Sequence, residues 1–113
     1  MHEMSLACEL SDLIENTARQ HNAKQVTEFT LEIGQLSGVE TESLLFCLES
    51  ALSGGIAARA AVKIIEKTGR GTCVQCHHRL NLQDYYTICP KCGHYEIQIT
   101  SGREFKLQSV ELI

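Results

Sequence analysis

The chain has 113 residues, of which 43% are hydrophobic, which suits one compact domain or a small domain plus a metal-stapled module. Fourteen acidic against ten basic residues give a net charge of −4, which argues against a cationic surface for nucleic acid or anionic lipid. No apolar stretch approaches the roughly 20 residues of a membrane-spanning helix, and no basic segment precedes an apolar one as in a secretion signal. We therefore expect a cytoplasmic protein without a membrane span.

The first half of the chain predicts two helices and a strand. Apolar side chains recur every three or four residues from Ser5 to about Gln20, which is typical of a helix. Apolar and polar residues alternate over residues 26–33, as in a half-buried strand. Ser37 and Glu40 have the spacing of a capping box, so we expect a second helix to begin there and to end at residues 53–55, where glycines favour a helix end.

Further strands are expected toward the C-terminus. Residues 61–65 form a strand candidate, and residues 68–71 read as a turn that marks a boundary. An extended pattern resumes at residues 97–100, and residues 105–113 form a last strand. The apolar positions of this last strand change phase after Leu107, which suggests a bulge or a change of packing face.

These elements predict an α+β fold. Two helices and about three strands build a small domain, into which a cysteine-rich segment is inserted before the last strand. We expect a discontinuous domain of residues 1–69 and 103–113, and a zinc-ribbon-like module of residues 70–102.

Four cysteines carry the strongest chemical signal, with the spacing Cys73-x2-Cys76-x12-Cys89-x2-Cys92. Each C-x-x-C pair points two thiolates at one metal, and two pairs complete the tetrahedral sulfur site that suits zinc. A closed four-thiolate site leaves no position for a substrate, so we expect structural zinc that folds the module. A redox switch that releases zinc on thiol oxidation is the sharper alternative.

The remaining cysteines and the nearby histidines have ordinary explanations. Cys8 and Cys47 lie on or beside the apolar faces of the two predicted helices, where free cysteine is commonly a small buried hydrophobe. A role as extra metal ligands is the minor alternative, which the closeness of Cys8 to His2 in sequence keeps open. His77, His78 and His94 flank the cysteine pairs and could replace a thiolate, but four cysteines make this unnecessary. We expect exposed loop histidines, with an approach of His94 to the N-terminus as a minor alternative.

Two surface features stay open at this stage. Glu40, Glu42 and Glu49 on the second helix read as a solvated face, although an acidic helix could also dock a basic patch on a partner. Tyr85 and Tyr86 are either a small contact surface or simple packing.

The chain begins Met1-His2-Glu3, and the second residue gives this segment a specific chemistry. The Met1 amine, the His2 amide nitrogen and the His2 imidazole can close two fused chelate rings. Three nitrogens in one plane suit square-planar nickel or copper and suit zinc poorly. The fourth ligand could be the Glu3 amide, a side chain or water, and such an exposed site favours delivery over storage.

The two metal motifs, in this order and at this chain length, closely resemble the HypA/HybF family of hydrogenase maturation proteins. The resemblance rests on Met1-His2-Glu3-Met4-Ser5-Leu6, Leu31-Glu32-Ile33-Gly34, Val39-Glu40 and the four-cysteine pattern. It covers nearly the whole chain and shows no departure in either metal motif.

The resemblance implies a nickel metallochaperone and not an enzyme. It implies transferable Ni(II) bound at the N-terminus, with His2 as the essential ligand and Met1 and Glu3 contributing. It also implies zinc on the four cysteines, a GTPase partner (HypB), and delivery of nickel to the large-subunit precursor of nickel-iron hydrogenase, with urease as a further client in some bacteria. The sequence leaves the oligomeric state open between a monomer and a homodimer.

Two other functions compete with nickel delivery. A zinc-ribbon adaptor for nucleic acid or protein would need a basic stripe with interleaved aromatic residues, and the region offers only a few cations, such as Arg70, Arg79 and Lys91. A thiol–disulfide enzyme would need a reactive cysteine at a helix start, whereas two paired knuckles favour zinc.

Overall fold

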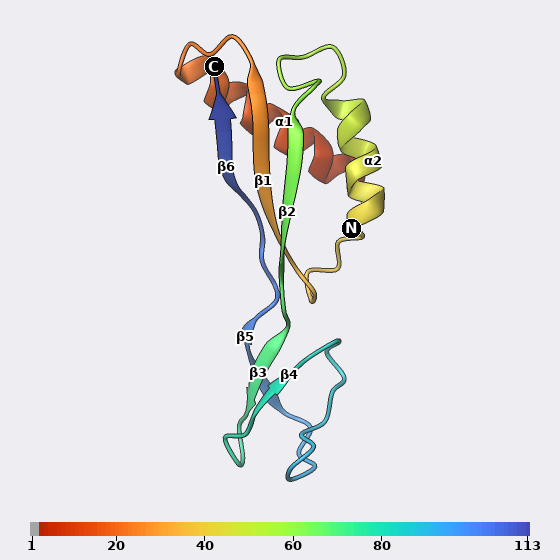
Figure 1. The fold of residues 1–113 in the computed structure, drawn as a ribbon. Helices are drawn as coiled ribbons and strands as arrows, with labels where there is room; N and C mark the ends of the chain where they lie inside the picture. Colours follow the sequence, from red (N-terminus) through yellow and green to blue (C-terminus); the bar gives the residue numbers. More distant parts are fainter. Residues whose placement is uncertain (1–2) are drawn as a thin grey trace. The chain divides into compact units, whose positions relative to one another are not determined.

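The computed structural model describes residues 3–113, and these form two helices and six strands (Figure 1). In chain order the elements are α1 (Glu3–Gln20), β1 (Val26–Gly34), α2 (Thr41–Ala51), β2 (Ala61–Lys67), β3 (Arg70–Cys73), β4 (Arg79–Asn81), β5 (Ile97–Ser101) and β6 (Phe105–Leu112). None of the helices within this range is long and apolar enough to cross a membrane. The predicted α+β class, with two helices and an added cysteine module, is confirmed.

The described chain packs into two compact units. The first contains the residues up to Leu31, Val39–Ile64 and Leu107–Ile113, and the second contains Glu32–Gly38 and Ile65–Lys106. The division falls inside β1, β2 and β6. The boundaries drawn from the sequence at residues 69/70 and 102/103 stay a prediction, because compactness alone does not show which segment folds independently.

The first unit has its core between the two helices and the sheet. Ala7, Leu10, Ile14 and Ala18 are buried on one face of α1, at the three- and four-residue spacing that the sequence predicts. The two helices contact each other, and the Ser11 hydroxyl donates a hydrogen bond to the Ala51 carbonyl at 3.3 Å. The small Ala7 and Ala18 side chains let neighbouring elements approach the helix backbone closely.

The three-stranded sheet has the order β2-β1-β6. The ion pairs Lys63–Glu28 (3.5 Å) and Lys67–Glu32 (3.4 Å) advance together along the two strands, so β1 and β2 are parallel and α2 lies in the crossover between them. Gln25 and Ile113 exchange two backbone hydrogen bonds of 3.2 and 3.0 Å at the other edge. Since the Gly34 amide donates to the Glu104 carbonyl at 2.7 Å farther along, β6 runs antiparallel to β1.

The central strand β1 differs from its prediction. The sequence predicts a half-buried strand with polar residues facing water, but Thr30 and Glu32 are buried as well as Phe29 and Leu31. Lysines of the two neighbouring strands, Lys67 and Lys106, lie against Glu32 on this face and help to cover it. Apolar and polar residues do alternate along β1, but this alternation does not predict that the polar side chains Thr30 and Glu32 are buried too.

The start of α2 also differs from its prediction. The helix begins at Thr41 with Glu40 as the N-cap, and the Glu40 carboxylate accepts the Glu42 amide at 3.3 Å. The capping box predicted at Ser37 is therefore wrong, because the Ser37 amide instead closes a turn onto the Gly34 carbonyl at 3.0 Å. The predicted end is confirmed, since Gly54 takes the positive φ of 77° just after the helix.

In the last strand, the change of phase predicted after Leu107 is confirmed. Phe105 and Leu107 are half-buried, Gln108 and Ser109 are both exposed, and half-burial resumes at Val110. One strand thus presents its apolar side chains in two different phases along its length.

The second unit holds a three-stranded sheet of order β4-β3-β5, with both pairs antiparallel. Thr72 pairs with Arg79 on one side and with Gln98 on the other. The sequence predicts a turn over residues 68–71, which is wrong in its second half because β3 begins at Arg70. The short strands β3 and β4 have no readable apolar period and were not predicted.

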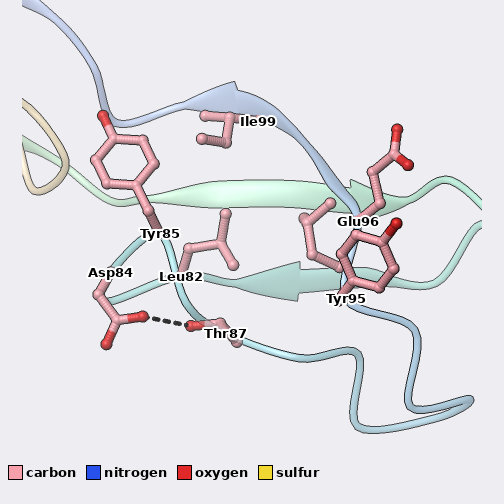
Figure 2. Close-up of a pocket in the computed structure, with 8 residues that line it drawn as sticks. Leu82, Asp84, Tyr85, Thr87, Tyr95, Glu96 and Ile99 are labelled. Carbon is pink, nitrogen blue, oxygen red and sulfur yellow. Dashed lines mark hydrogen bonds between the residues drawn. The ribbon is translucent and has the colours of Figure 1, made fainter.

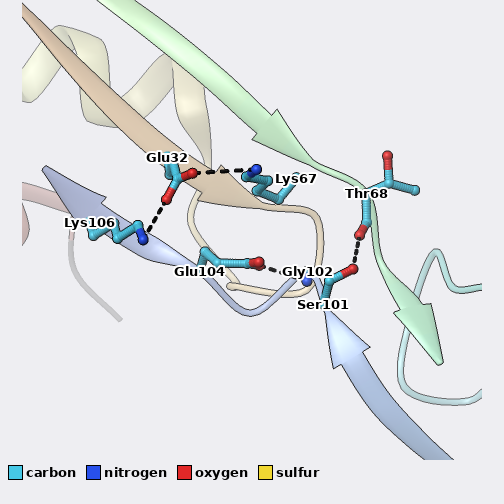
Figure 3. Close-up of polar contacts among 7 residues, drawn as sticks. All are labelled: Glu32, Lys67, Thr68, Ser101, Gly102, Glu104 and Lys106. Carbon is cyan, nitrogen blue, oxygen red and sulfur yellow. Dashed lines mark hydrogen bonds and ion pairs between the residues drawn. The ribbon is translucent and has the colours of Figure 1, made fainter. Parts of the chain in front are cut away.

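Glu32 forms a buried ionic contact in this unit (Figure 3). Its two carboxylate oxygens face Lys67 Nζ at 3.4 Å and Lys106 Nζ at 2.9 Å. Hydrogen bonding with Lys106 and the positive charge of both lysines lower the pKa of Glu32 despite its burial. The contact therefore stabilises the fold above the ordinary carboxylate pKa and is lost as the pH falls through the lowered value.

Beside this ionic contact, the backbones of residues 34 and 102 cross closely. A Cβ atom on Gly34 would overlap the backbone of Gly102, whose amide donates to the Glu104 carboxylate at 2.6 Å (Figure 3). We expect Gly34→Ala to lower the free energy of unfolding by about 2 kcal/mol or more, because neither backbone can yield cheaply. Urea unfolding of the zinc-loaded protein measures this.

Gly38→Ala is the matched control. Gly38 has a φ of 79° and open space around its Cβ position, so its substitution carries only the left-handed backbone cost of about 1 kcal/mol. Equal losses in the two variants would contradict the close crossing at Gly34.

Candidate metal centre

The four predicted cysteines meet at one point in the second unit. Their sulfur atoms all lie within 4.8 Å of one another. The closest pairs join the two C-x-x-C segments, with Sγ–Sγ distances of 3.6 Å for Cys73–Cys92 and for Cys76–Cys89. Cys73 ends β3, and Cys89 begins the second knuckle, and both are buried.

This geometry fits a zinc ion. A tetrahedral site with Zn–S bonds of about 2.3 Å places neighbouring sulfurs about 3.8 Å apart, and the cluster already has spacings close to that value. Four thiol donors with no carboxylate or imidazole among them select zinc over the harder cations. The cluster therefore fits the closed, structural kind of zinc site.

The two knuckles share one backbone pattern. The amides of Cys73 and Cys89 donate to the carbonyls of His78 and His94, both at 2.9 Å. A left-handed residue follows each second cysteine, namely His77 with φ 64° and Gly93 with φ 78°. The sequence predicts the turn at Gly93 because glycine signals it, whereas His77 carries no such signal.

The four thiols of the cluster differ in pKa. The backbone amide of Cys76 lowers the pKa of Cys73 against the effect of burial. Burial raises the pKa of Cys89, but the amides of Cys92 and Lys91 outweigh it and bring this pKa to about 6. The amide of His94 lowers the pKa of Cys92, yet burial and the three neighbouring thiols together raise it to about 12. A bound cation is what would let all four sulfurs be thiolates at neutral pH.

The other candidate ligands stand apart from the cluster. Among the described residues, the four cysteines form the one group of three or more potential ligands close enough to share an ion. Cys47 is half-buried, and Cys8 is exposed, so the prediction that Cys8 is a buried hydrophobe is wrong. An α1 position beside the apolar stripe can face water, and the sequence period leaves this ambiguous.

The histidines near the knuckles have structural roles. His77 is exposed as predicted, but His78 and His94 are half-buried, because their carbonyls hold the knuckle amides inside the unit. The His94 ring lies against Tyr95, with centroids 4.9 Å apart.

A small cavity of about 230 Å³ lies beside the second-unit sheet, and Asp84 bonds Thr87 at its edge (Figure 2). Its volume is below the range usual for small-molecule sites. The Tyr85 hydroxyl donates to the Leu36 carbonyl at 2.7 Å, although the residue is 56% exposed, and Tyr86 is 89% exposed.

The predicted nickel residues lie at the other end of the sequence. Met1 and His2 fall outside the described residues, and Glu3 is the first residue of α1. The Glu3 carboxylate accepts the Glu40 backbone amide at 3.2 Å, so Glu3 lies beside the start of α2. The contact of Glu40 with Glu3 was not predicted from the sequence, because it joins residues 37 positions apart.

The knuckle pattern generates a prediction for His77. A left-handed φ costs a non-glycine residue about 1 kcal/mol, so His77→Gly should stabilise the zinc-loaded protein by about 0.5–1 kcal/mol with zinc stoichiometry unchanged. Gly93→Ala is the counterpart and should destabilise by a similar amount. Urea unfolding and a colorimetric zinc assay measure both. Loss of zinc in His77→Gly would instead make the imidazole a ligand.

Comparison with known proteins is consistent across the whole chain. A family model described as "Hydrogenase/urease nickel incorporation, metallochaperone, hypA" matches residues 1–112. The hydrogenase maturation factor HypA of Dechloromonas aromatica is 43% identical over 99% of both chains. The HypA of Chlorobium luteolum is 41% identical over 97% of this chain and 94% of its own.

The fold agrees with solved structures. The solution structure of the Ni metallochaperone HypA from Helicobacter pylori has 25% identity and a TM-score of 0.69, covering 100% of this chain and 98% of that one. A second solution structure of a HypA protein has 26% identity and a TM-score of 0.71, covering 100% and 97%. The chain therefore belongs to the HypA family of hydrogenase and urease nickel-incorporation metallochaperones, whose members are named as hydrogenase maturation factors.

Proposed function

We propose that this chain binds Ni(II) through Met1, His2 and Glu3 and delivers it to the large-subunit precursor of nickel-iron hydrogenase, with urease as a further client. The full-length match to a nickel-incorporation family carries the proposal. The unbroken Met1-His2-Glu3 motif supports the location of the site.

The chemistry of the N-terminal motif suits a transferable ion. The Met1 amine, the His2 amide nitrogen and the His2 imidazole supply a planar nitrogen set, which nickel accepts and zinc does not favour. The Glu3 carboxylate accepts the Glu40 amide, so the residue next to His2 is held at the start of α2. This contact supports a site whose third residue is held in place.

The four cysteines have a separate role in this proposal. Cys73, Cys76, Cys89 and Cys92 would hold zinc, whose positive charge supplies the folding energy that a unit with few buried apolar side chains lacks. Because this closed set of four sulfurs leaves no open coordination position, zinc bound there would take no part in nickel transfer.

The partners follow from the same family. We propose the GTPase of the maturation pathway (HypB) and the hydrogenase precursor as partners, with the chain as a monomer or homodimer. All six cysteines are free, which is typical of a reducing compartment and supports a cytoplasmic location.

Nickel titration by calorimetry and visible absorption tests the site. Zinc-loaded native protein should bind nickel at one site that disappears in His2→Ala. Two residues added before Met1 should weaken binding or change the spectrum, because they remove the free amine from the chelate. Zinc content should stay constant throughout.

The control variant is His21→Ala, which removes an exposed imidazole at the end of α1, where its Nδ1 lies 2.9 Å from the Thr17 carbonyl oxygen. It should bind nickel like the native protein. Equal binding by the native, His2→Ala and extended forms would contradict the N-terminal site.

A further inference from the structure

One face of the sheet in the second unit is polar and has no role in the metal sites. The central strand β3 buries Gly71 and Cys73 on one side, whereas Arg70 is exposed and Thr72 half-buried on the other. Directly paired residues of neighbouring strands share a face of the sheet. We call the polar side chains gathered on this second side the arginine face: Arg70, Thr72, Arg79, Asn81 and Thr100.

The strand register makes the two arginines neighbours. Arg70 of β3 pairs with Asn81 of β4, and Thr72 pairs with Arg79. The two arginines are therefore diagonal neighbours on adjacent strands, a position in which Cβ atoms lie about 7 Å apart. Arginine side chains are long enough to meet across this gap, so both guanidinium groups can contact one ligand that lies between them.

Neither arginine is neutralised by a neighbour. The ion pairs among residues 3–113 involve lysines only, and neither guanidinium has a hydrogen-bond partner within that range. Each guanidinium carries five N–H donors, and two like charges on adjacent strands repel each other. A bound anion would satisfy these donors and remove the repulsion.

A hollow of about 500 Å³ lies over this face. The arginine face lines it together with Gly71 and Leu80, so the lining has hydroxyl and amide groups but no carboxylate and no aromatic ring. The volume is within the range of small-molecule sites. The hollow therefore offers positive charge and hydrogen-bond donors to an anion, and it offers no ring on which a base would stack.

An irregularity in β5 adds a hydroxyl to the same hollow. Arg70 pairs with Ser101, but Gly71 pairs with Ile99, so Thr100 has no partner in β3. Such a bulge re-aims a side chain, and bulges are frequent next to functional sites. Here the bulged residue Thr100 lines the hollow beside the arginines.

The arrangement of the donors selects the kind of anion. A guanidinium donates two parallel hydrogen bonds to an oxyanion. A planar carboxylate has one edge that accepts such a pair, whereas a tetrahedral phosphate has several edges and can accept from two arginines at once. Because the two arginines approach from different strands, a phosphate group fits this face better than a carboxylate does.

We propose that the arginine face is a binding site for a small, soluble phosphate-bearing anion. Arg70 and Arg79 hold one phosphate group between them, and the hydroxyls of Thr72 and Thr100 donate to its remaining oxygens. The site lies wholly within the second unit. The inference goes beyond nickel delivery and does not depend on the N-terminal nickel site.

Titration of isotope-labelled, zinc-loaded protein with phosphate or pyrophosphate at constant ionic strength tests this by amide NMR. The shifts should saturate and concentrate on residues 70–72, 79–81 and 98–100. Arg70→Gln and Arg79→Gln should each weaken binding about tenfold or more, because each removes a forked, charge-assisted contact. Arg79→Lys keeps the charge and loses the fork, so it should weaken binding less than Arg79→Gln.

The matched control is Arg59→Gln, which removes an exposed guanidinium of the first unit. It should bind within about twofold of the native protein, because a distant exposed charge is screened. Zinc content should stay constant in every variant, so that loss of the fold does not account for weaker binding. The proposal is overturned by shifts that do not saturate, by native-like binding in Arg70→Gln and Arg79→Gln, or by an equal loss in Arg59→Gln.

Other anions identify the source of the ligand. Succinate at the same ionic strength should leave these amides unshifted, and succinate binding equal to that of pyrophosphate would overturn the choice of phosphate. A single-stranded oligonucleotide and vesicles of anionic phospholipid are titrated in parallel. Binding of either about tenfold tighter than pyrophosphate, with a steep salt dependence, would assign the face to a phosphate backbone or a membrane and overturn the proposal.

Discussion

Four sulfur atoms drawn within 4.8 Å of one another are the constraint on which the second unit depends. Backbone amides lower the pKa of two of these cysteines, while burial and hydrogen bonds with the three neighbouring thiols raise the pKa of Cys92 to about 12. Such a cluster is compact and fully ionised only with a cation at its centre. The buried side chains of this unit are few and include Cys73 and Cys89 themselves, so an ion bound there would stand in for part of a hydrophobic core.

The chemistry of the donors then separates two metals within one short chain. Thiolates in a closed tetrahedron hold zinc and exclude exchange. The nitrogen donors proposed at the N-terminus would form a planar set, which favours nickel. The contact of Glu3 with Glu40 holds the third residue of that motif at the start of α2.

Local patterns predicted most of the fold. The helical period over α1, the alternation in β1, the C-x-x-C spacing and the phase change after Leu107 each depend on near neighbours, so the sequence displays them directly. The failures involve distant partners. The contact of Glu40 with Glu3 and the burial of Glu32 depend on residues far along the chain, and the short strands β3 and β4 are ordered by pairing. The left-handed φ of His77 could not be predicted, because histidine does not favour this conformation as glycine does.

X-ray absorption at the zinc and nickel edges of one sample, loaded with one equivalent of each metal, tests the separation of the two metals most directly. The account predicts four sulfur neighbours at about 2.3 Å around zinc. Around nickel it predicts only nitrogen and oxygen neighbours, with the pre-edge signature of a planar site. Sulfur around nickel, or nitrogen replacing sulfur around zinc, would show that the two metals share the cysteines and would contradict the account.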